Sequence, residues 1–162
     1  MIISLENKDT LVIDKFYLKC CIGKNGVNNK KREGDFTTPK GTFNLNKLYF
    51  RKDRLGKVKC KIPKRIITKS MAWCDDSNHK KYNKEIHIST KYHKECLFRS
   101  DHKYDYLIST SHNQKGIPNK GSAIFIHLTN NYKPTAGCIA LKKKDFEIVL
   151  KLINKKTKIK ID

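Results

Sequence analysis

The chain has 162 residues and a formal net charge of +21, from 36 Lys plus Arg against 15 Asp plus Glu. The length suits one domain, residues 1–162, with a sizeable core, and 38% hydrophobic and 9% aromatic residues argue against a disordered chain. The charge favours a polyanionic partner: nucleic acid, an acidic wall polymer or an anionic membrane. Lysines are spread almost evenly, however, and arginines, which make bidentate base contacts, number only five, so no specific nucleic acid is expected.

The cysteines and the hydropathy of the chain indicate whether the protein has disulfides, a structural metal or a membrane span. There are six cysteines, with Cys20 and Cys21 adjacent, and none stands in a CxxC or zinc-binding spacing. We therefore expect free thiols and no structural metal. The first ten residues lack a basic region followed by an apolar one, so no export signal is visible. No stretch approaches the length of a membrane span.

Short β-prone segments separated by polar turns account for most of the chain. Turns are predicted over residues 23–26 and 38–41, where Gly and Pro stand at turn spacing. Residues 57–62 and 65–69 are predicted to form a hairpin with Pro63 at its bend. The pattern of β-branched and aromatic residues predicts strands at 1–5, 11–14, 16–22, 42–50, 85–90, 104–110, 123–128, 137–141 and 157–161.

One amphipathic helix is predicted, over residues 143–154. Its apolar residues Phe146, Val149, Leu150 and Ile153 fall at i, i+3, i+4 and i+7, so they share one face. Acidic residues lie towards its start and lysines at its end, the arrangement that the helix dipole favours. The sequence thus predicts a mainly β domain of mixed strands with a short helix packed late in the chain.

The candidate chemistry lies in residues 124–141. His127 ends an apolar, β-prone run, and Cys138 follows Gly137 and opens a second apolar run. Two neighbouring strands joined by a loop would bring the imidazole and the thiol together. A thiol beside an imidazole is expected to become a thiolate near neutral pH, and the thiolate is the nucleophile. The first hypothesis is therefore a cysteine acyl-transfer enzyme, with His127 as its base.

Residues around this pair suggest supporting roles. Gly137 allows close approach of the backbone to a substrate, and the N–H groups of Gly137 and Cys138 could stabilise an oxyanion. Thr135 could bond the imidazole, the turn backbone or the substrate, or be a simple turn residue. His112, which follows Ser109-Thr-Ser, could line the same cleft. No HExxH spacing occurs, so a hydrolytic metal is not proposed.

The residues from Ile126-His127 to Pro134-Thr-Ala-Gly-Cys138-Ile-Ala-Leu141 resemble the catalytic signature of the L,D-transpeptidase (YkuD) catalytic-domain family, in the branch that reads Thr-Ala-Gly-Cys. Ala136 and Ala140 depart from the commoner pattern, which has His before Gly-Cys and often Arg or Asn two residues after the cysteine. The resemblance extends over three upstream stretches: Arg32-Glu-Gly-Asp35 with Thr38-Pro-Lys-Gly-Thr-Phe43, Trp73-Cys-Asp-Asp76 with Tyr82-Asn83, and Gly121-Ser-Ala-Ile-Phe125.

The resemblance implies a β-sandwich-like fold with a short helix, Cys138 as nucleophile, His127 as base, and an imidazole oriented by a backbone carbonyl near Leu128. It also implies a peptidoglycan stem peptide as substrate, no cofactor, and a place in the cell envelope or periplasm. Cys138 would form a thioester and pass the acyl group to an amine, or to water in a carboxypeptidase. Arg32, Lys40 or Arg99 could hold substrate carboxylates.

Two alternatives stay open. The same thiol could serve a hydrolase or an amidase-like acyltransferase. A non-enzymatic basic module would instead bind a polyanion with steep salt dependence and would need no particular cysteine. No recognised nucleic-acid motif supports this second alternative. In either case we expect a monomer.

Overall fold

The computed structural model describes residues 1–29 and 32–162 of this mainly β protein. Two α-helices are present among these residues, α1 (Lys52–Leu55) and α2 (Lys143–Leu152). The strands in chain order are β1 (Ile2–Glu6), β2 (Thr10–Ile13), β3 (Phe16–Cys21), β4 (Val27–Asn28), β5 (Thr38–Pro39), β6 (Gly41–Phe50), β7 (Lys64–Ile66), β8 (Met71–Cys74), β9 (Glu85–His87), β10 (Lys94–Cys96), β11 (Tyr106–Thr110), β12 (Phe125–Leu128), β13 (Ile139–Leu141) and β14 (Lys158–Ile161).

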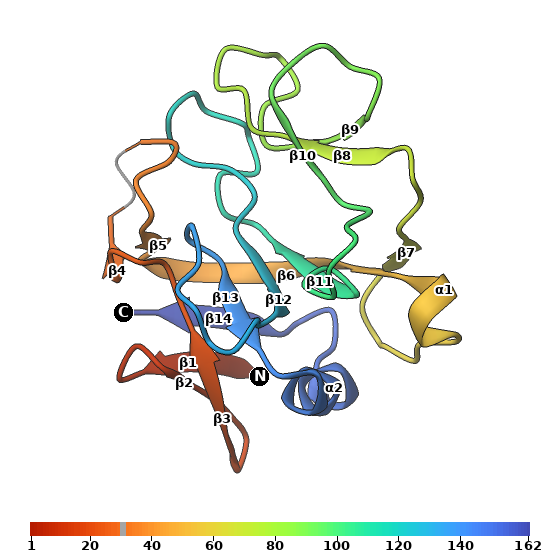
Figure 1. Cartoon of the computed structure of the whole chain (residues 1–162). Helices are drawn as coiled ribbons and strands as arrows, with labels where there is room; N and C mark the ends of the chain where they lie inside the picture. The colour runs from red at the N-terminus through yellow and green to blue at the C-terminus, as the bar shows by residue number, and fades with distance from the viewer. Residues whose placement is uncertain (30–31) are drawn as a thin grey trace.

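Eight of the strands close on themselves (Figure 1). Their order is β11-β12-β13-β3-β2-β1-β14-β6, and β6 pairs again with β11, while β7 adds to the edge of β6. The pairing is mixed, because β1–β14, β12–β13 and β6–β7 are parallel. The expected mainly β fold is confirmed, but a sandwich of two separate sheets is not, because a closed ring leaves few unpaired edges.

The main core fills the inside of this ring and is closed by the predicted late helix. Phe146, Val149 and Leu150 of α2 are buried in it, and the Phe146 ring stacks on Tyr106 at 5.1 Å. The helix ends at Leu152, two residues before the predicted end, because Ile153 has extended backbone angles. Its side chain is still fully buried, as the apolar spacing predicts.

A second hydrophobic cluster lies on the outer wall of the ring, under the three-stranded sheet β10-β8-β9. Along β12 the side chains alternate, as in any strand. Ile126 and Leu128 belong to the inner core, and Phe125 belongs to the outer cluster, together with Cys138. In Figure 1 the small sheet stands at the end of the molecule opposite α2. The outer cluster is where the candidate site is built.

The predicted hairpin of residues 57–62 and 65–69 is wrong. Residues 57–62 form no strand, only an isolated bridge from Lys61 to Asn154. β7 pairs in parallel with β6 instead, and the Pro63 carbonyl accepts the Leu48 N–H. Proline does not prevent this, since it lacks only the donor. The sequence prediction also missed α1, β4, β8 and β10, and strand β5 begins within residues 38–41, where a turn was predicted.

Candidate active site

His127 lies on β12, and Cys138 directly precedes the neighbouring strand β13; both lie against the outer cluster. β12 and β13 pair in parallel with His127 opposite Ala140. Cys138 stands two residues before Ala140, so the twofold alternation of a strand places its side chain on the same face as His127. The Phe125 N–H, two residues before His127, donates to Cys138 Sγ at 3.4 Å. The prediction that paired strands bring these two residues together on one face therefore agrees with the strand register.

The imidazole of His127 is held in one tautomer. Its Nδ1 lies 2.8 Å from the Leu128 carbonyl oxygen. Because a carbonyl oxygen only accepts, Nδ1 carries the proton and Nε2 keeps its lone pair. The side chain is buried, and burial lowers the pKa of His127 to about 4, with Lys103 and Arg99 acting in the same direction. At neutral pH the imidazole is thus an uncharged base with Nε2 as its acceptor.

The thiol of Cys138 is also held in its neutral form. Its Sγ donates to the Ala123 carbonyl at 3.0 Å, and such a contact requires a proton on sulfur. The residue is buried, with 9% of its surface exposed. This contact favours a neutral thiol at rest, whereas the sequence led us to expect a thiolate. The Phe125 N–H is placed to stabilise charge on sulfur once the proton leaves.

The turn before Cys138 is braced by two threonines. Gly137 has φ of 146°, which L-residues with a side chain rarely adopt. Thr135 Oγ1 accepts the Gly137 N–H at 3.1 Å and donates to the Cys138 carbonyl at 2.6 Å. Thr38, from β5, donates to the Gly137 carbonyl at 2.9 Å. The Thr135 hydroxyl therefore bonds the backbone of the turn, which is one of the roles considered for it. The Gly137 N–H would have to leave Thr135 before it could stabilise an oxyanion.

These features coincide with a family match. The model of YkuD, the L,D-transpeptidase catalytic domain, matches residues 2–161. The chain belongs to this family. The comparison agrees with the resemblance that the sequence motifs indicated and extends it over essentially the whole chain. No curated protein and no solved structure gave a match.

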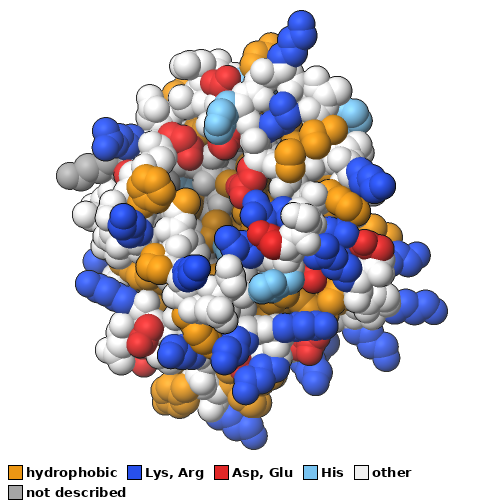
Figure 2. All heavy atoms as spheres, viewed as in Figure 1, with side chains coloured by type: hydrophobic (Ala, Val, Ile, Leu, Met, Phe, Trp, Pro, Cys, Tyr) orange, Lys and Arg blue, Asp and Glu red, His pale blue; other side chains and the backbone are white. Residues whose placement is uncertain are grey.

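L,D-transpeptidase family proteins act on peptidoglycan, and the family is an enzyme family. Among the described helices, none is both long and apolar enough to cross a bilayer. Lys and Arg side chains are spread over much of the face seen in Figure 2, interleaved with acidic ones, rather than gathered in one patch.

A residue that sequence reasoning did not single out joins the parts of the site. Asn83, which is buried, accepts hydrogen bonds at Oδ1 from Trp73 Nε1 at 2.9 Å and from the Ala123 N–H at 3.0 Å. Its Nδ2 donates to the carbonyls of His112 and Asn113. Asn83 therefore fixes Ala123, which has φ of 52° and supplies the acceptor for the thiol. Its only sequence signal is its place in the Trp73–Asn83 stretch of the family resemblance.

The remaining predicted site residues lie apart from the thiol or are already paired. The His112 ring packs edge-on against Phe43, and its Nε2 bonds the Lys120 carbonyl. Arg32 is exposed, and its backbone N–H donates to Asp35. Arg99 forms an ion pair with Asp101 at 2.7 Å. Arg99 acts on the imidazole of His127 through its charge, as Lys103 does.

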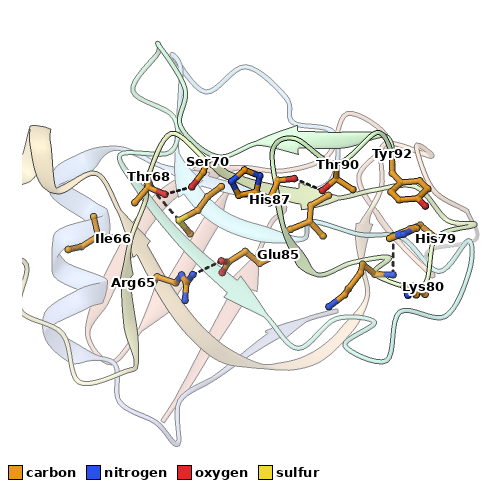
Figure 3. A pocket seen from close by; sticks show the side chains of 13 residues that line it. Arg65, Ile66, Thr68, Ser70, His79, Lys80, Glu85, His87, Thr90 and Tyr92 are labelled. Atoms are coloured by element: carbon orange, nitrogen blue, oxygen red, sulfur yellow. Dashed lines mark hydrogen bonds and ion pairs between the residues drawn. The ribbon is translucent and has the colours of Figure 1, made fainter.

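Cavities lie beside His127 and elsewhere on the described part of the chain. A small one of about 50 Å³ opens beside His127 and is lined by Lys103, Thr135 and Ala140, among others. A larger one of about 860 Å³ lies between β7 and β9 (Figure 3). Figure 3 shows Arg65 reaching Glu85 in its middle and Tyr92 lying against His79 at one end. Neither Cys138 nor His127 lines the larger cavity.

Proposed function

We propose that the protein is a cysteine acyltransferase that performs L,D-transpeptidation of peptidoglycan stem peptides through a thioester on Cys138. The observation that carries the proposal is the tautomer of His127, because Nδ1–H on the Leu128 carbonyl leaves Nε2 as the base on the face that also carries Cys138. Membership of the L,D-transpeptidase family supplies the substrate class. No cofactor is needed for these steps.

The first half-reaction makes the thioester. The Cys138 thiol proton passes to His127 Nε2 as sulfur attacks the carbonyl of the L-centred residue of an L–D bond, giving a tetrahedral oxyanion. Collapse of this intermediate breaks the C–N bond. The imidazolium returns its proton to the departing amine, which leaves as the terminal D-amino acid.

The second half-reaction returns the enzyme. An amine of a neighbouring stem attacks the thioester, gives its proton to His127, and forms the new amide bond as the C–S bond breaks. Sulfur leaves as a thiolate and takes the proton back from the imidazolium. Water in place of the amine gives a free carboxylate, which is the carboxypeptidase alternative.

Mass spectrometry of the protein incubated with a β-lactam of the carbapenem type tests the nucleophile. We expect a single adduct on Cys138, absent from Cys138→Ala and present in Cys96→Ala, which removes an exposed cysteine as a matched control. An adduct that persists in Cys138→Ala would contradict the assignment. His127→Gln is expected to slow acylation by about 100-fold or more, the effect of losing a general base.

The acceptor is tested with a tetrapeptide stem, with and without an amine acceptor. Formation of a crosslinked product that requires the amine supports the transpeptidase. Loss of the terminal residue at an equal rate in both conditions would show that water is the acceptor and would favour the carboxypeptidase.

A further inference from the structure

A second pair of side chains, part-buried, lies against the imidazole and has no part in the steps above. Tyr104, just before β11, donates its hydroxyl proton to the Glu95 carboxylate from β10. Tyr104 is 5% exposed, and Glu95 lies opposite Trp73 in the small sheet. This contact therefore connects the small sheet to the wall that carries His127.

The Tyr104 ring touches the site itself. Its centroid lies 5.3 Å from that of His127 with an interplanar angle of 76°, and 6.1 Å from that of Phe125. Phe125 in turn donates its N–H to the Cys138 sulfur. The edge-on contact blocks one side of the imidazole, while Nδ1 is held by a backbone carbonyl. The two contacts together restrict rotation of the imidazole plane and so fix the direction of Nε2.

A charged residue, Arg99, also contacts the Tyr104 ring. The Arg99 guanidinium lies 5.2 Å from the Tyr104 ring centroid. Arg99 is itself fixed by two hydrogen bonds to the Asp101 carboxylate, at 2.9 and 2.7 Å. A cation over an aromatic face in a partly dry setting is stabilising, so the ring is clamped as well as bonded at its hydroxyl.

The same segment returns to the imidazole through the backbone. Asp101 Oδ1 accepts the Lys103 N–H at 3.1 Å, and the Lys103 carbonyl accepts the Leu128 N–H at 2.9 Å. The Leu128 carbonyl is the group that holds His127 Nδ1. A continuous series of contacts therefore surrounds His127. It runs from Tyr104 through Asp101 and Leu128 to the imidazole, which packs on Tyr104 again.

Protonation decides between a chemical and a positioning role for Tyr104. Burial raises its pKa well above the ordinary value, and the neighbouring Glu95 and Cys138 raise it further. The phenol thus stays protonated and always has a proton to donate to Glu95. It cannot serve as the base that ionises the thiol, which leaves the role of holding the imidazole.

We propose that Tyr104, tied by Glu95, is a positioning residue that holds the His127 imidazole in the orientation needed for proton transfer from Cys138. This role rests on the acyl transfer proposed above. It also gives the small sheet a function, because β10 supplies the carboxylate that anchors the ring.

The test compares Tyr104→Phe, Glu95→Ala and Glu95→Gln. Tyr104→Phe keeps the ring but releases it from β10, so thioester formation should slow by about 10–100-fold in kcat with KM little changed. Glu95→Ala should behave in the same way. Glu95→Gln keeps an oxygen that accepts the phenol proton and should recover most of the rate.

Tyr106→Phe is the matched control. Tyr106 also donates to a glutamate, Glu147, at 3.3 Å, but its ring packs on Phe146 of α2 in the inner core. This variant removes the same hydroxyl from a tyrosine two residues further along the chain, on β11, and should leave the rate unchanged. An equal loss of rate in Tyr106→Phe and Tyr104→Phe would overturn the proposal, because it would indicate a general effect of destabilising β11.

A second readout does not depend on the reaction. The ¹⁵N NMR shifts of the His127 ring, assigned by comparison with His127→Gln, report which nitrogen carries the proton. We expect a Nδ1–H signature in the wild type and a mixture of tautomers in Tyr104→Phe. Unchanged ring shifts in Tyr104→Phe would overturn the positioning role. If the wild type forms no thioester, the proposed function fails, and the NMR comparison alone still decides the role of Tyr104.

Discussion

Thr38 donates a hydrogen bond to the Gly137 carbonyl across 99 positions of sequence. The same hydroxyl oxygen accepts the Gly23 N–H at 2.8 Å, and the Thr38 side chain is fully buried. The turn that presents Cys138 is therefore fixed by a residue of the N-terminal half. This contact gives a physical reason for the Thr-Pro-Lys-Gly stretch that accompanies the cysteine motif.

Thr38→Val should destabilise the protein and slow the labelling of Cys138. It leaves the Gly23 N–H and the Gly137 carbonyl buried without this partner, a loss of about 2–4 kcal/mol in the free energy of unfolding. Urea unfolding and the rate of carbapenem adduct formation measure the two effects. Thr10→Val is the control, because Thr10 makes only an exposed contact to Asp9. Equal stabilities of the two variants would contradict the bracing role.

Gly137→Ala should impair the turn directly. With φ of 146°, an added Cβ strains the backbone by about 1–3 kcal/mol or forces the turn to shift. Gly34→Ala is the comparison, because Gly34 has φ of 72° with open space around it, far from the thiol in sequence. Both variants should lose stability, but only Gly137→Ala should lose reactivity at Cys138. Wild-type labelling in Gly137→Ala would argue against a required turn conformation.

Asn83→Asp should disconnect the site from the small sheet. A carboxylate oxygen then faces the carbonyls of His112 and Asn113 in place of the amide donor, which should cost about 2–4 kcal/mol. Thermal unfolding and adduct formation at Cys138 test this. Asn46→Asp is the control, because it loses a single hydrogen bond, from the Asn46 side-chain amide to the Thr110 carbonyl. The expectation fails if the two variants are equally stable.

Stability should fall in mild acid because of His127. Its pKa is about 4 in the folded state and near 6.5 when unfolded, so the unfolded chain binds the extra proton between these values. The free energy of unfolding should therefore drop as pH falls from about 6.5 to about 4, by on the order of 3 kcal/mol from this residue.

Glu95 acts in the opposite sense. Burial raises its pKa, so its contribution is present below its ordinary pKa and is lost as pH rises. In His127→Gln the acid-induced loss due to the imidazole should disappear, while the loss of stability that Glu95 causes as pH rises should remain. Denaturant unfolding of both proteins from pH 4 to pH 7 checks this. A wild-type slope retained in His127→Gln would show that other groups cause the loss.

The strand and helix patterns were largely predictable from local sequence. Alternation of β-branched residues located β1, β3, β6 and β12, and the spacing from Phe146 to Ile153 located α2, because each of these elements buries one face. The actual arrangement of residues 57–69, which form no hairpin, was not predictable from the sequence. The partner of β7 is the edge of β6, which the sequence near β7 does not encode.

The sequence by itself indicated the candidate pair: one cysteine after a glycine and one histidine at the end of an apolar run, in motifs that indicate the family. Only the tertiary structure decided their state and support. Burial on the outer wall keeps the imidazole neutral, and the Ala123 carbonyl keeps the proton on sulfur. Asn83, Thr38 and Tyr104 become part of the site because pairing across the closed ring and the small sheet brings distant segments into hydrogen-bonding contact, which no local pattern records.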